Sequence, residues 1–116
     1  SRIMLAIKTV LADVDEVETL VFDEIDTGIS GLAAKSVAEK MKIISKKHQV
    51  LCITHLASIA AKGDYNYYIS KNETLGKLQT SIKLLNEKET IEEIARIASG
   101  DITDISLQHA QNLRIA

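Results

Sequence analysis

Two short apolar runs, each leading into polar residues that can do chemistry, constrain the fold of this chain most strongly. The first run occupies residues 20–22 and leads directly into Asp23 and Glu24. It lacks the alternation of a half-exposed strand, so it predicts a strand covered on both faces, as in a parallel sheet flanked by helices. The second run occupies residues 50–53, and His55 follows two residues later. The sequence therefore predicts two buried strands whose carboxyl ends both carry ionisable side chains.

Helical periodicity surrounds these two strands. Apolar residues recur at helical spacing in residues 2–12 and in residues 31–47, and residues 56–61 predict a short third helix. The predicted buried stripe of the second helix consists of Ala34, Val37, Met41 and Ile44. Helices that alternate with strands imply βαβ crossovers and a parallel sheet.

The pattern changes to alternation in the second half of the chain. Residues 65–71 and 77–84 read as two strands, with a five-residue hairpin loop at residues 72–76. On the second strand, apolar and polar side chains point to opposite faces. Three tyrosines, Tyr65, Tyr67 and Tyr68, accompany the first strand. Such residues can stack on nucleic-acid bases, but far more often they pack a hairpin.

Two helices are predicted to end the chain. Asn86 and Glu89 have the spacing of a capping box for a helix over residues 87–98, with Gly100 shortly after its end. Thr103 can cap a last helix that runs through Leu113.

Composition indicates one globular domain or part of one. The 116 residues are 46% hydrophobic and 26% charged, which argues against disorder. No apolar run approaches the ~20 residues of a membrane span, and the start shows no signal peptide. The lone Cys52 rules out an intrachain disulfide and fits a reducing compartment. The net charge is −2 and there is no stripe of basic residues, so the sequence does not indicate strong non-specific binding to nucleic acid.

The acid pair after the first strand has two interpretations. Mg²⁺ keeps several waters and takes one or two protein carboxylates, so Asp23 alone can orient it beside a nucleotide, and Glu24 can position and deprotonate a water. The simpler interpretation is that two acids begin a solvated loop. His55 can hydrogen-bond a phosphate if both strands share one edge, or it can be a strand-end histidine satisfied by a backbone carbonyl.

Together these segments resemble the C-terminal part of the ATPase head of the RecN family, which are bacterial DNA repair proteins related to SMC and ABC-type ATPases. The resemblance rests on residues 1–8, 19–31 and 49–56, and residues 102–113 are also similar. It implies an α/β, P-loop NTPase-like lobe with a mainly parallel sheet, a hairpin and two C-terminal helices. Residues 1–116 would form a single partial domain.

The resemblance also implies roles for particular residues. Asp23 would be the Walker B aspartate that holds Mg²⁺ through water, Glu24 the catalytic glutamate, and His55 the switch histidine near the γ-phosphate of ATP. The segment with Asp26, Gly28 and Ser30 would be the D-loop, which crosses the interface with a second head.

The phosphate-binding Walker A loop, the ABC signature and the coiled coil are absent from this sequence. We therefore expect a segment of a longer protein that acts in double-strand-break repair and recombination in the bacterial cytoplasm, associated with the nucleoid. Its DNA contacts would come from other regions, and it would have no membrane partner. By itself the segment would not hydrolyse ATP.

Three other interpretations stay open at this point. The chain could belong to another SMC-like or ABC-type head. It could be a receiver-like phosphoacceptor domain, although the second strand ends in Thr54 and His55 where a receiver needs an aspartate. It could also serve mainly as a dimerisation surface.

Overall fold

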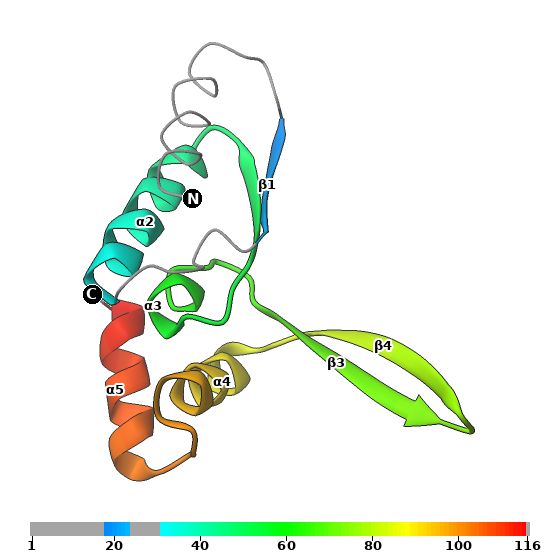
Figure 1. The fold of residues 1–116 in the computed structure, drawn as a ribbon. Coiled ribbons are helices and arrows are strands. Elements are labelled where there is room, and N and C mark those ends of the chain that lie inside the picture. Colours follow the sequence, from blue (N-terminus) through cyan, green and yellow to red (C-terminus); the bar gives the residue numbers. More distant parts are fainter. Residues whose placement is uncertain (1–17, 24–30, 116) are drawn as a thin grey trace.

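The computed structural model describes residues 18–23 and 31–115, which form the elements drawn in Figure 1. In chain order these elements are β1 (Thr19–Asp23), α2 (Gly31–Ile44), β2 (Gln49–Ile53), α3 (Ala57–Ala60), β3 (Tyr67–Thr74), β4 (Lys77–Leu84), α4 (Glu87–Ser99) and α5 (Asp104–Ile115). The helix expected over residues 2–12 lies outside the described residues.

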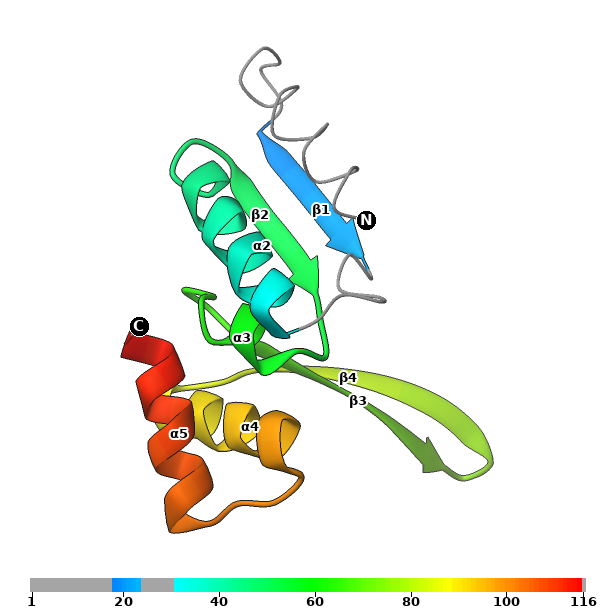
Figure 2. The ribbon, with the colours of Figure 1, turned by 60° about the vertical axis from the view of Figure 1, so that its left-hand side comes forward.

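The predicted parallel pairing of the two apolar strands is present. β1 and β2 lie side by side (Figure 2), in a register that runs from Thr19 opposite Gln49 to Asp23 opposite Ile53. α2 connects the two strands and packs on one face of the pair. The rest of the predicted sheet is only partly confirmed, because the described strands form one parallel and one antiparallel pair, not one larger sheet.

Among the residues that the structure describes, the β1–β2 pair has one buried face. Phe22 is 0% exposed and packs against α2, whereas Val21 is 53%, Leu51 48% and Ile53 51% exposed. Side chains alternate along a strand, so Val21 must point away from the face that holds Phe22. The expectation of strands covered on both faces is therefore wrong for the described residues.

α2 has the predicted buried stripe and ends earlier than expected. Its buried residues are Ala34, Val37, Ala38, Met41 and Ile44. The helix stops at Ile44 and does not continue to Lys47. Beyond it the Lys46 and Lys47 amides donate to carbonyls three residues back, and the Ser45 hydroxyl donates to the Lys42 carbonyl at 2.6 Å. A serine that competes for a helix carbonyl favours such an ending.

β3 and β4 form an antiparallel hairpin that extends away from the helices (Figure 1). The predicted five-residue loop is wrong: the strands run to Thr74 and from Lys77, so only Leu75 and Gly76 connect them. Both residues have positive φ, 53° and 75°. Two positive φ values give the turn a twist that matches the strands, which is why pairing continues to the tip. Every residue of β4 is exposed, so its alternating pattern exists without burial on either side.

The C-terminal helices begin as predicted. At the start of α4, the Glu89 amide donates to Asn86 Oδ1 at 2.8 Å, and the Asn86 amide donates to Glu89 Oε1 at 3.2 Å. α4 ends at Ser99, with Gly100 in the left-handed conformation. Before α5, the Ser106 amide donates to Thr103 Oγ1 at 3.1 Å. No helix among the described residues is long and apolar enough to cross a membrane.

Two hydrophobic clusters hold the described residues together, and α3 touches both. Phe22, the buried stripe of α2 and Ile59 form the first cluster. Ala61, immediately after α3, belongs to the second cluster with Ile94, Ala95 and Ala110. The short segment from Ile59 to Ala61 is thus packed into both cores.

Candidate nucleotide-facing edge and a cationic clamp

The carboxyl edge of the β1–β2 pair brings together the described candidate residues. Asp23 is the last residue of β1, lies opposite Ile53, and is exposed. Thr54 and His55 leave the sheet directly after Ile53. Because parallel strands end at the same edge, Asp23 and His55 share the edge at which open α/β sheets bind ligands.

The turn after β2 is fixed on both sides of His55. The Leu56 amide donates to Thr54 Oγ1 at 3.0 Å, and Leu56 packs against the first hydrophobic cluster. His55 is exposed between these two anchored residues. A threonine that bonds its own backbone two residues on stabilises a turn of this kind.

The remaining candidates, Glu24, Asp26, Gly28 and Ser30, lie outside the described residues. Within residues 18–23 and 31–115, no three His, Cys, Asp or Glu side chains group in a way that could hold a metal ion. A single exposed carboxylate such as Asp23 still fits Mg²⁺, which retains waters and needs few protein ligands. The edge offers one carboxylate and one imidazole, which is suitable for part of a phosphate site.

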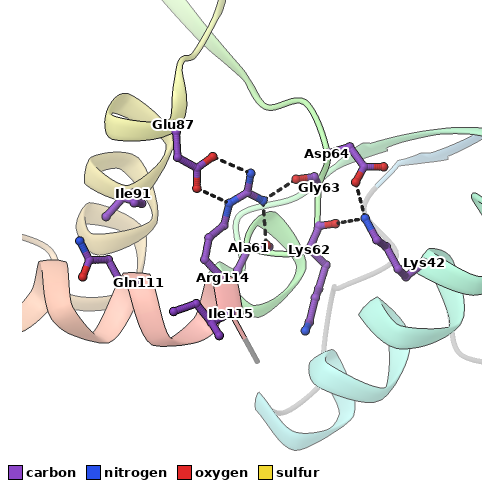
Figure 3. A pocket seen from close by; sticks show the side chains of 10 residues that line it. All are labelled: Lys42, Ala61, Lys62, Gly63, Asp64, Glu87, Ile91, Gln111, Arg114 and Ile115. Atoms are coloured by element: carbon purple, nitrogen blue, oxygen red, sulfur yellow. Dashed lines mark hydrogen bonds and ion pairs between the residues drawn. The ribbon is translucent and has the colours of Figure 1, made fainter.

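The structure also contains a depression with charged side chains in its lining that the sequence did not predict. It has a volume of about 670 Å³ and lies where α2, the turn after α3, α4 and α5 meet (Figure 3). Its lining includes the cations Lys42, Lys62 and Arg114 and the carboxylates Asp64 and Glu87. Neither Asp23 nor His55 lines it.

Arg114 is the centre of this depression. Its Nε and Nη2 donate to the two Glu87 oxygens at 3.2 and 3.1 Å, and its Nη1 donates to the carbonyls of Ala61, at 2.9 Å, and Gly63. From the opposite side, Lys42 Nζ donates to the Lys62 carbonyl at 3.3 Å and pairs with Asp64. The hydrogen bond from Arg114 lowers the pKa of Glu87 below its ordinary value.

No local sequence pattern predicts these contacts of Arg114. Arg114 is 27 residues from Glu87 and 53 residues from Ala61 in the chain. Such contacts depend on how α5 packs, which periodicity and capping rules do not specify.

Comparison with solved structures identifies a shared fold. One chain, from work titled as structural biochemistry of ATP-driven dimerization and DNA-stimulated activation of SMC ATPases, superimposes with a TM-score of 0.64. The match covers 83% of this chain and 57% of that chain at 22% identity. The chain thus shares its α/β fold with part of that chain.

The particular protein that this chain resembles is the DNA repair protein RecN. It is 46% identical to RecN of Halalkalibacterium halodurans and 43% identical to RecN of Bacillus subtilis, each over 114 residues. RecN of Treponema pallidum is 47% identical. Each match covers 97% of this chain and 20% of the relative, so the chain spans about a fifth of their length. No protein-family model matches the chain. The resemblance to the C-terminal part of RecN is confirmed.

Proposed function

We propose that this chain supplies part of the ATP-hydrolysing head of a RecN-type protein that acts in double-strand-break repair and recombination. The observation that carries the proposal is the shared edge: Asp23 ends β1, and His55 follows the end of the neighbouring β2. The RecN relatives, which are named as DNA repair proteins, support the cellular role. The SMC-type fold supports the ATPase activity.

In this proposal each residue of the edge has one task. Asp23 would hold Mg²⁺ through water. The bound metal would supply charge neutralisation during phosphoryl transfer. Glu24 accepts a proton from the attacking water, whose oxygen bonds to the γ-phosphorus as the bond to the bridging oxygen breaks. His55 donates a hydrogen bond to a γ-phosphate oxygen, where negative charge is held.

The rest of the site would come from other parts of the protein. This sequence has no glycine-rich loop followed by the lysine that binds phosphates, so that loop must be supplied from outside it. Asp26, Gly28 and Ser30 would form a D-loop that faces a second head in an ATP-dependent dimer. DNA would be bound by other regions, in the bacterial cytoplasm and near the nucleoid.

The experiment that tests this function uses the full-length protein with Glu24→Gln. The variant should bind ATP as the wild type does and lose hydrolysis, because the amide cannot accept the proton from water. Glu73→Gln is the matched control, since Glu73 is an exposed residue of β3. Turnover near the wild-type rate in Glu24→Gln would show that the catalytic assignment is wrong.

A further inference from the structure

α3 depends on its neighbours for its position. The helix has only four residues, Ala57–Ala60, and a helix this short has no independent stability in water. His55 stands two residues before its first residue. Only Leu56 separates His55 from the first residue of α3, so a displacement of α3 would act on the C-terminal end of the turn that carries His55.

Cationic side chains hold the far end of this helix. Three consecutive backbone carbonyls, those of Ala61, Lys62 and Gly63, each accept a hydrogen bond from Arg114 or Lys42 (Figure 3). Carbonyls at the end of a helix lack partners within the helix, and cationic donors satisfy them well. The turn after α3 is thus fastened to α5 by Arg114 and to α2 by Lys42.

Arg114 holds the turn after α3 more firmly than Lys42 does. Its side chain is 17% exposed, whereas that of Lys42 is 44% exposed. The guanidinium contacts both oxygens of Glu87 and two carbonyls at once, which a planar fork of donors can do and an ammonium group cannot. Glu87, at the start of α4, fixes the orientation of that fork.

We propose that Arg114 is a positioning residue for His55. By binding the Ala61 and Gly63 carbonyls it sets the place of α3, and through α3 it sets the place of the imidazole at the sheet edge. The inference rests on the proposed function, since it assigns Arg114 to the same ATPase site. Arg114 touches neither nucleotide nor water in this mechanism, and it acts through His55 alone.

The test is steady-state ATP turnover by the full-length protein. Arg114→Ala should lower kcat by about tenfold or more and leave the KM for ATP nearly unchanged, because small misplacements of a group at the reacting centre cost rate. Arg114→Lys should restore only part of kcat, since it keeps the charge but not the fork. Arg96→Ala is the matched control, because Arg96 bonds Glu93 of its own helix. It should behave as the wild type.

A double variant separates positioning from general stability. His55→Ala with Arg114→Ala should be no slower than His55→Ala alone, because Arg114 has nothing further to position once the imidazole is gone. Losses that multiply, or a loss in Arg114→Ala no larger than in Arg96→Ala, would overturn the inference. If Arg114→Ala does not fold, Glu87→Ala takes its place and should lower kcat by a smaller factor. An unchanged kcat in Glu87→Ala would then overturn it.

The outcomes also distinguish this inference from the proposed function. If His55→Ala is slow and Arg114→Ala is not, only the positioning role is lost. If His55→Ala turns over at the wild-type rate, the role of His55 at the site is wrong, and the inference fails with it.

Discussion

Asp23 lies directly opposite Ile53 in the parallel pairing of β1 with β2. The two strands therefore end at the same level, and Thr54 and His55 leave the sheet beside the aspartate. A shift of one residue in this register would turn Phe22 out of the core and move the Asp23 side chain to the other face. The burial of Phe22 thus fixes the position of the polar edge.

We expect the isolated 116-residue chain to show no Mg²⁺-dependent ATP hydrolysis, because its sequence contains no glycine-rich phosphate loop. The measurement is phosphate release by purified protein, with Glu24→Gln as a control for contaminating ATPases. Turnover that the Glu24→Gln substitution abolishes would contradict the expectation.

Phe22→Ala should destabilise the chain by about 3–5 kcal/mol, because it removes a large, fully buried side chain and leaves a cavity. Chemical denaturation of both proteins measures the difference. Leu32→Ala is the control, since Leu32 is an 87% exposed position of α2. It should change the free energy of unfolding by less than about 0.5 kcal/mol. Equal effects would mean that Phe22 is not in the core.

Asn86→Ala should cost about 1 kcal/mol of stability, because it removes the side-chain oxygen that accepts from the Glu89 amide. Thermal unfolding gives the comparison. Asn112→Ala, at an exposed position of α5, removes an asparagine without touching a cap and should be close to neutral. If α4 began elsewhere, the two variants would have similar stabilities.

Leu75→Asn should stabilise the hairpin by roughly 0.5–1 kcal/mol, because asparagine tolerates the positive φ that leucine adopts here at a cost. Leu75→Val, which is branched at Cβ, should have the opposite effect. Amide hydrogen exchange of β3 and β4 measures both. Slower exchange in the valine variant would indicate a different turn.

Glu87 makes part of the stability depend on pH. Its pKa is lowered from 4.5 in the folded state, chiefly by the hydrogen bond from Arg114, so its contribution is present above that value. The contribution is lost as the pH falls through the lower, folded-state pKa. Glu87→Gln should therefore unfold at a lower temperature than the wild type at neutral pH, and the difference should vanish in acid. A difference that persists below the folded-state pKa would exclude this ionisation as its cause.

Local rules predicted most of the elements. The stripe of α2, the capping box at Asn86 and the cap at Thr103 were predicted from the sequence because each depends on residues three or four positions apart. The prediction of a five-residue hairpin loop was wrong, because the actual two-residue turn places Leu75 at a positive φ, which leucine rarely adopts. The end of α2 was misplaced for a similar local reason, the hydroxyl of Ser45.

The candidate site was predicted only in part. The shared edge of Asp23 and His55 follows from two parallel strands, which the sequence indicated. The clamp of Arg114 on Ala61, Gly63 and Glu87 joins three distant segments, so it required the packing of α5. The exposure of Val21 could not be predicted from the sequence. A short apolar run looks the same whether one face or both faces of the strand are covered.

The contact of α3 with both hydrophobic clusters also bears on cooperativity. Ile59 packs in one core and Ala61 in the other, only two residues apart. If one core melts, the other loses a packing partner within the same helical turn. We therefore expect the described parts of the two cores to unfold in a single transition. A strain at the sheet edge that destabilises the first core would therefore also lower the stability of the C-terminal helices.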